Sequence, residues 1–122
     1  STQAKTLFPY TTLFRSLDVT RDFTNVSDVL DAYLALAEKG VSGEVYNVCS
    51  GLEYRVRDLV AQMIVMTGLD IQLQNDPARF RKAEQTRVVG DNSKLRADTG
   101  WAPKVDIAAS LAEILDDWRA RA

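Results

Sequence analysis

Residues 21–40, with the sequence RDFTNVSDVLDAYLALAEKG, form the segment that decides the fold. Apolar side chains in it recur at helical spacing, which predicts an amphipathic helix whose apolar face packs in the core. They are Val26, Val29, Leu30, Tyr33, Leu34 and Ala37. Ser27 is a suitable N-cap, and Gly40 follows Lys39 as a stop signal. The preceding LDVTRDF (17–23) is rich in β-branched and apolar residues and predicts an extended segment.

The alternation of helix and strand signals continues downstream. GEVYNVCSG (43–51) is a short apolar run between glycines and predicts a buried strand. YRVRDLVAQMIVMTG (54–68) places its apolar residues on one helical face and ends in glycine, which predicts a second helix. DIQLQ (70–74) alternates apolar and polar residues, as a half-exposed strand does, and NDPARFRKAEQTR (75–87) predicts a loop.

The C-terminal part predicts further helices. NSKLRADTG (92–100) indicates a short helix closed by its glycine, and another helix begins near Asp106 with an apolar stripe. That stripe contains Ile107, Leu111, Ile114, Leu115 and Trp118. The fold class is therefore α/β, more narrowly an α+β fragment with three to four helices and two to four short strands.

Composition limits the classes of function. The 122 residues suit one domain, and a net charge of −2 argues against a nucleic-acid partner, which would need a basic face. No apolar run has the length of a membrane span, so we expect no membrane partner. The chain has no histidine and one cysteine, Cys49, which we interpret as a structural thiol in a cytoplasmic protein.

The candidate chemistry lies in arginines. The sequence has no glycine-rich phosphate loop and no Tyr-x-x-x-Lys spacing, but Arg21, Arg79 and Arg81 come from two segments, with Glu84 close to Arg81. Guanidinium groups that converge from two segments suit a diphosphate, and a carboxylate beside them suits a pair of sugar hydroxyls. The alternative is that these are solvated loop charges, and spacing alone leaves that alternative open.

Four blocks of the sequence together resemble a known family. RDFTNVSDVLDAYLALAEKG, GEVYNVCSG, DPARFRKAE and GDNSKLRADTGWAPKVDIAASLAEILDDWR are similar, in order and spacing, to the C-terminal part of extended short-chain dehydrogenase/reductase enzymes. These are the NAD-dependent epimerases and dehydratases of nucleotide sugars. The resemblance covers about residues 17–121 and is strongest to the branch of GDP-mannose 4,6-dehydratases and GDP-4-keto-6-deoxymannose reductases.

The resemblance implies roles for three residues. Arg21 and Arg81 would hold the nucleotide diphosphate of a GDP-sugar, and Glu84 would hold its ribose, with Arg79 as a secondary candidate. Lys82 stands where this branch often has proline, which would make the loop less preorganised. The family's catalytic Tyr and Lys and its NAD(P) loop would lie upstream, so we expect no catalytic residue and no bound cofactor on this chain.

The resemblance also implies the activity of the parent protein. We expect a reductase that uses NADP or NAD to reduce the 4-keto group of a GDP-6-deoxyhexose, assembled as a homodimer or homotetramer. The related dehydratase, or another nucleotide-sugar epimerase/dehydratase, is the alternative. A non-enzymatic α+β interaction module is an alternative from another class. The fragment alone is expected to be inactive.

The first residues do not fit the pattern of the rest. TLFPYTTLFRS (6–16) resembles the translation of a common sequencing adapter at all eleven residues. We therefore divide the chain into a non-native head, residues 1–16, and a truncated nucleotide-sugar-binding domain, residues 17–122, compact from about Asn25 onward. Truncation should leave apolar surface uncovered, because the domain would pack against the cofactor-binding half of the parent.

Overall fold

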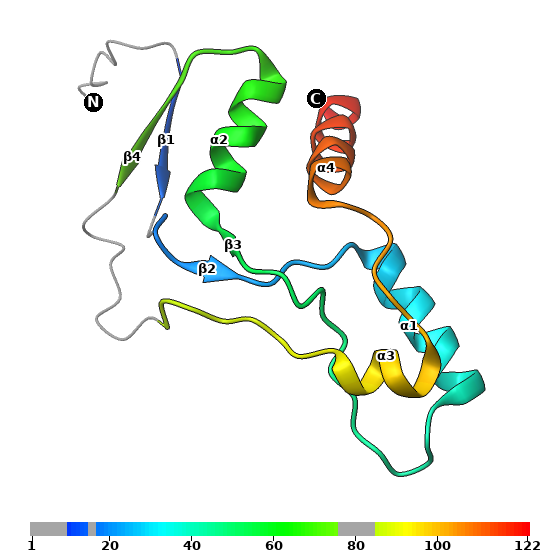
Figure 1. Ribbon diagram of the computed structural model, residues 1–122. Helices are drawn as coiled ribbons and strands as arrows, with labels where there is room; N and C mark the ends of the chain where they lie inside the picture. Colours follow the sequence, from blue (N-terminus) through cyan, green and yellow to red (C-terminus); the bar gives the residue numbers. More distant parts are fainter. Residues whose placement is uncertain (1–9, 15–16, 76–84) are drawn as a thin grey trace.

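The computed structural model describes residues 10–14, 17–75 and 85–122. The expected α/β class is confirmed, with four helices and four short strands within those ranges (Figure 1). In chain order they are β1 (Tyr10–Phe14), β2 (Thr20–Arg21), α1 (Val26–Lys39), β3 (Tyr54–Arg55), α2 (Val56–Thr67), β4 (Ile71–Asn75), α3 (Ser93–Thr99) and α4 (Ile107–Arg121).

The helices form two pairs with short strands between and beside them. α1 packs against α3, and α2 packs against α4. A two-residue antiparallel ladder of β2 and β3 lies between the helix pairs, with Arg21 opposite Tyr54 (Figure 1). β1 and β4 pair in parallel on the side of α2 that faces away from α4. With sheets of two strands each, helix packing must supply most of the buried apolar surface.

The α1–α3 pair is fastened to the α3–α4 connector by one buried aspartate. Asp28, in the first turn of α1, is 2% exposed, and its carboxylate accepts the backbone N–H groups of Lys104 and Val105, both at 3.0 Å. Its carbonyl oxygen accepts the indole N–H of Trp101 at 3.0 Å. Trp101 packs with Ala32 and Leu95 in the core of this half. The buried carboxylate of Asp28 and the indole N–H of Trp101 thus have hydrogen-bond partners, and these bonds join α1 to the α3–α4 connector.

The helix ends agree with the sequence signals except at the start of α1. Gly68 and Gly100 close α2 and α3 with φ of 68° and 72°, which glycine adopts without steric cost. The N-cap of α1 is Asn25, not Ser27 as predicted: Asn25 is extended, and its side-chain oxygen accepts the N–H of Ser27 at 2.9 Å. Both residues are good caps, and the structure uses the earlier one.

The predicted strand at residues 43–51 is wrong. No strand is assigned there, and several of its backbone groups bond to side chains: the carbonyl of Cys49 accepts the side-chain amide of Asn92, and the N–H of Ser50 donates to Asp22. Tyr46 and Val48 still pack against the core, whereas Val45 is 81% exposed. The residues have strand character, but a strand also needs a partner strand, and the described chain supplies none here.

The predicted core face of α1 is also largely wrong. Val26 and Leu34 are 71% and 67% exposed, and Leu30 and Tyr33 on the same face are exposed as well. The buried face of the helix contains Asp28 and Ala32 instead. Apolar spacing identified one face of the helix correctly as apolar, but that face has no cover within the described residues.

The predicted head includes one described element. Residues 10–14 form β1, which is in register with β4, while residues 1–9 and 15–16 lie outside the described residues. The non-native origin of residues 1–16 stays a prediction. Among the described helices, none combines the length and apolar character needed to cross a membrane.

The Asp28 junction gives a first prediction. Asp28→Ala would leave two buried backbone donors unpaired, so the free energy of unfolding should fall by about 3 kcal/mol. Asp31→Ala, on the exposed side of the same helix, is the control and should change it by less than about 0.5 kcal/mol. Urea unfolding followed by circular dichroism measures both. Equal stability of the two variants would contradict the role given to Asp28.

Candidate functional site

The candidate site is built around β2, which carries Arg21. One side of β2 pairs with β3. On the other side, the N–H of Thr20 donates to the carbonyl of Thr86 at 2.9 Å, and the N–H of Val88 donates to the carbonyl of Thr20 at 3.2 Å. These bonds make a parallel bridge between Thr20 and Arg87. Residues 86–88, which follow the segment with Arg81 and Glu84 in sequence, are therefore hydrogen-bonded directly beside β2.

The structure locates one of the three predicted site residues. Arg21 is half-buried on β2, and its guanidinium donates to the carbonyl of Thr20 at 2.7 Å. Arg81 and Glu84, together with Arg79, lie in residues 76–84, outside the described residues. The described chain resumes at Gln85, one residue after Glu84, and enters the bridge beside β2.

Asp22, next to Arg21, joins three segments. Its Oδ1 accepts the N–H of Ser50 at 2.9 Å and the hydroxyl of Ser50 at 2.6 Å. Its Oδ2 accepts the N–H groups of Gly51 at 2.9 Å and Gly90 at 3.2 Å. Burial alone would raise the pKa of Asp22, but the hydrogen bonds from Ser50, Gly90 and Gly51 outweigh it and hold the pKa below its ordinary value.

Sequence reasoning missed Asp22. Its partners lie 28 to 68 residues away in sequence, so no local pattern marks it as a junction. The only available signal is its place in the RDF triplet beside a candidate ligand residue.

Asn92 and Gly90 complete the junction near the start of α3. The side-chain amide of Asn92 donates to the carbonyls of Cys49 at 2.9 Å and Ser50 at 3.2 Å. A Cβ atom on Gly90 would lie 2.4 Å from the sulfur of Cys49, so this approach requires glycine. Burial and the charges of Asp22 and Asp91 raise the pKa of the Cys49 thiol, which fits a structural thiol.

Two cations near β2, Arg57 and Arg87, are paired with carboxylates. The Nε of Arg57 lies 3.2 Å from a carboxylate oxygen of Asp18, and Arg87 forms a close ion pair with Glu53. The chain has no histidine, and the described residues hold no group of three or more side chains that could bind a metal ion.

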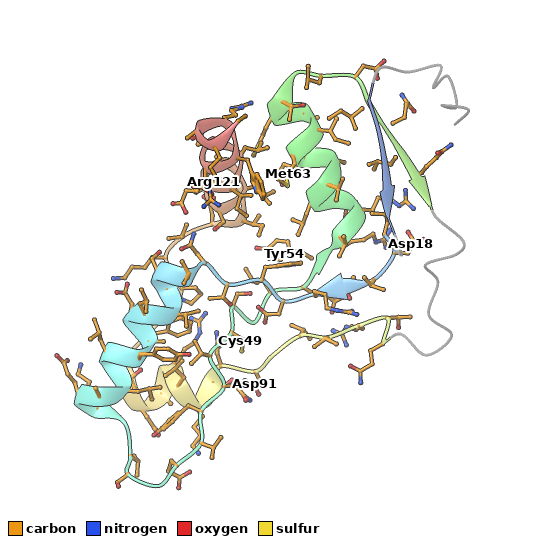
Figure 2. All side chains as sticks on the ribbon, turned by 180° about the vertical axis from the view of Figure 1, so that it is seen from behind. Asp18, Cys49, Tyr54, Met63, Asp91 and Arg121 are labelled. Carbon is orange, nitrogen blue, oxygen red and sulfur yellow. The ribbon has the colours of Figure 1, made fainter. Side chains whose placement is uncertain are left out.

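An apolar groove of about 690 Å³ lies beside the junction, between the start of α1, α2 and α4. Tyr54, Met63 and Leu111 are among its lining residues. Figure 2 shows Met63 on the side of α2 that faces α4, and Cys49 with Asp91 near the start of α3. The groove lining is mostly apolar, so it offers packing surface more than polar recognition.

Tyr46 and Lys94 form a tyrosine–lysine contact, with Nζ 4.9 Å from the ring centre. The Tyr46 hydroxyl donates to Asp98 at 2.7 Å and accepts the N–H of Val41 at 2.9 Å. The hydrogen bond to Asp98 raises the pKa of Tyr46. These contacts join residues 41–46 to α3.

The chain resembles known proteins over most of its length. The family described as GDP-mannose 4,6 dehydratase matches residues 10–114. The GDP-6-deoxy-D-mannose reductase of Pseudomonas aeruginosa is 47% identical over 105 residues, which are 86% of this chain and 34% of the relative. The UDP-glucose 4-epimerase of Mycolicibacterium smegmatis is 28% identical over 89% of this chain and 34% of the relative.

Solved structures give the same picture. The structure of RMD from Pseudomonas aeruginosa complexed with NADPH superposes with a TM-score of 0.86 at 41% identity, over 92% of this chain and 37% of that one. The UDP-glucose 4-epimerase of Thermotoga maritima with UDP-glucose gives a TM-score of 0.81 at 28% identity, over 89% and 35%. The chain thus spans about a third of the length of these relatives.

The depressed pKa of Asp22 predicts how stability depends on pH. In the unfolded chain the carboxyl regains a pKa near 3.8, so the unfolded state binds more protons than the folded state below that pH. The stability from Asp22 should be complete above that value and lost as the pH falls through the folded pKa.

Asp22→Asn should remove this part of the acid dependence, and Asp31→Asn, which is exposed and outside the junction, should retain it. Urea midpoints between pH 7 and pH 3 measure the difference. An unchanged pH profile in Asp22→Asn would show that the carboxylate is not held as described.

Proposed function

The chain belongs to the GDP-mannose 4,6 dehydratase family, and on that premise we propose that it supplies the diphosphate and ribose contacts of a GDP-sugar oxidoreductase. One observation carries the proposal: residues 86–88, which follow Arg81 and Glu84 in sequence, are hydrogen-bonded directly beside β2, the strand of Arg21. Arginines from two neighbouring segments, Arg21 on one and Arg81 on the other, would suit an elongated anion such as a nucleotide diphosphate.

Each of the three residues has a distinct part in this proposal. Arg21 and Arg81 make forked hydrogen bonds to the diphosphate oxygens and keep their charge at all physiological pH values. Glu84 accepts hydrogen bonds from the ribose hydroxyls. The binding energy from these remote groups would hold the sugar in place for chemistry at its C4 carbon. Nothing in this role requires proton transfer by the chain itself.

The parent activity that we propose is reduction of the 4-keto group of a GDP-6-deoxyhexose. The 47% identity to a GDP-6-deoxy-D-mannose reductase supports it over the related dehydratase, which remains the alternative. Identity to a UDP-glucose 4-epimerase and to a dTDP-D-glucose 4,6-dehydratase is lower, at 28% for each. The substrate of the parent would accordingly be a GDP-sugar.

The residues of this chain do not fit a nicotinamide cofactor. The sequence contains neither a glycine-rich phosphate loop nor a Tyr-x-x-x-Lys spacing. NADP or NAD would therefore bind to another part of the parent, and no turnover is expected from this chain alone. We place no step of the reaction on its residues.

The uncovered apolar surface is where we propose that the rest of the parent packs. One face of α1 is apolar and exposed, and it contains Val26, Leu30, Tyr33 and Leu34. Val45, in the segment 43–51, is exposed as well. Exposed apolar faces of this extent mark packing surfaces. In this proposal residues 17–122 are part of a larger nucleotide-sugar-binding protein of the cytoplasm, and residues 1–16 are foreign to it. Assembly as a homodimer or homotetramer stays a prediction.

A non-enzymatic interaction module is the second candidate. The exposed face of α1 favours it, because such a face could bind a protein partner without any nucleotide. The two candidates differ in whether the chain binds GDP.

Isothermal calorimetry with GDP tests the nucleotide proposal. We expect weak binding, reduced about 10-fold in both Arg21→Ala and Arg81→Ala, because each loses charge-assisted hydrogen bonds. Arg121→Ala is the control, since Arg121 pairs with Asp117 at the end of α4. No GDP binding by the folded chain would reject the proposal and leave the interaction module.

The packing proposal predicts that Leu34 can be replaced at no cost to folding of this chain. Leu34→Glu should change the free energy of unfolding by less than about 0.5 kcal/mol and should reduce self-association and binding of an apolar dye. Ala32→Glu, on the buried face of α1, is the matched opposite and should prevent folding. Urea unfolding and sedimentation measure the pair. Strong destabilisation by Leu34→Glu would show that the face is already covered.

A further inference from the structure

We propose that β4 (Ile71–Asn75) is a strand-addition site: its backbone takes up an uncharged extended segment in parallel, and residues 10–14 are the segment that occupies it in this chain. A strand-addition site is a sheet edge that binds an extended peptide through main-chain hydrogen bonds. The proposal concerns the kind of peptide partner that this edge accepts, and it is independent of nucleotide binding.

Contacts that do not involve β1 attach β4 to the helices. Ile71 and Leu73 are half-buried and, with side chains of α2 and α4, line an apolar hollow of about 280 Å³. Thr67, at the end of α2, holds the turn that leads into β4. Its hydroxyl donates to the carbonyl of Ile64 at 2.7 Å and accepts the N–H of Leu69 at 3.2 Å. The strand that receives the partner is therefore positioned by the helices.

Residues 10–14 are held on this edge by backbone pairing. The register runs in parallel from Tyr10 opposite Ile71 to Phe14 opposite Asn75, and among the described strands β1 pairs with β4 alone. The intervening chain contains both α1 and α2, so no tight turn sets the register. Because pairing depends on the two strands and not on a hairpin between them, an unlinked segment of the same kind should also pair.

The absence of charge defines the chemistry of the partner. Neither IQLQN (71–75) nor YTTLF (10–14) contains a charged residue or a proline. Edge strands usually carry lysine, other charges or proline, which oppose pairing with a further strand. β4 lacks these features over its whole length, so its edge is open to strand addition. Its partner would be an extended segment rich in β-branched and aromatic residues, which favour strands.

The family match supports a strand at this place. It begins at Tyr10, the first residue of β1, and therefore includes the whole of β1. The same residues belong to the head that we predict to be foreign to the parent. A strand position that is common to the family and is filled here by such a sequence fits an edge that selects extended backbone and absence of charge more than particular side chains.

Amide hydrogen exchange on the full chain tests the pairing. Proline has no N–H and fixes φ at about −65°, so Thr12→Pro should release β1. We expect the β4 amides that bond to β1 to exchange about 10-fold faster in this variant. Thr12→Val, which keeps the backbone donor, is the matched control and should change the exchange less than about 2-fold. Should Thr12→Pro not fold, Thr12→Gly is the milder variant, with an expected increase of about 3-fold.

A separate peptide tests whether the segment is exchangeable. The peptide with the sequence of residues 6–16 should restore slow exchange of β4 in the released variant and should leave the unaltered chain unchanged, because its edge is already occupied. Titration to about 1 mM covers the weak affinity expected for one short strand. The same peptide with Thr12→Pro is the control and should restore nothing.

Three results would overturn the proposal. Equal exchange of β4 in the unaltered chain and in the proline and glycine variants would show that β1 does not cover the edge. Faster exchange that the peptide does not reverse would show that β4 accepts only the covalently linked segment. Faster exchange in Thr12→Val, comparable to that in Thr12→Pro, would show that a particular side chain and not the backbone holds the partner.

Discussion

The hydrogen bonds to the carboxylate of Asp22 are the interaction on which the centre of the structure depends. The described strands around it are short: β2 and β3 share a ladder of two residues, and the returning segment adds one bridge. The side chain of Asp22 therefore connects neighbouring segments that a longer sheet would connect through backbone hydrogen bonds. Because it receives four donors on a charged acceptor, it can join segments that lie far apart in sequence. The candidate site is placed on this junction and not on a helix or a wide sheet.

Asp28 likewise connects distant segments, here the helices, through hydrogen bonds to its carboxylate. It is almost fully buried and connects the start of α1 to the connector that leads into α4. Together the two aspartates hold a chain whose apolar surface is only partly covered, as the exposed face of α1 shows. A domain with so much uncovered apolar surface relies more than usual on specific polar ties. The groove between α2 and α4 is likewise lined mostly by apolar side chains.

Local patterns predicted the helices well because caps and spacing are local signals. Gly68 and Gly100 ended their helices as expected, and Asp106 caps α4 by accepting the N–H of Ala109. The strand at 43–51 and the core face of α1 could not be predicted, because each depends on what lies next to it and not on its own residues. Arg21 is a candidate from its residue type and from the family resemblance, and its role stays a prediction. Asp22 could not be predicted as a junction residue, since its partners are set by the tertiary fold alone.

In the proposed arrangement, Arg21 on β2 and Arg81 in residues 76–84 both bind the same nucleotide diphosphate. A crystal structure of this chain with bound GDP is the most direct test. The account predicts the two guanidinium groups within hydrogen-bonding distance of the same diphosphate, with Glu84 at the ribose. Guanidinium groups directed to opposite faces of a well-formed domain, or GDP bound elsewhere, would contradict it.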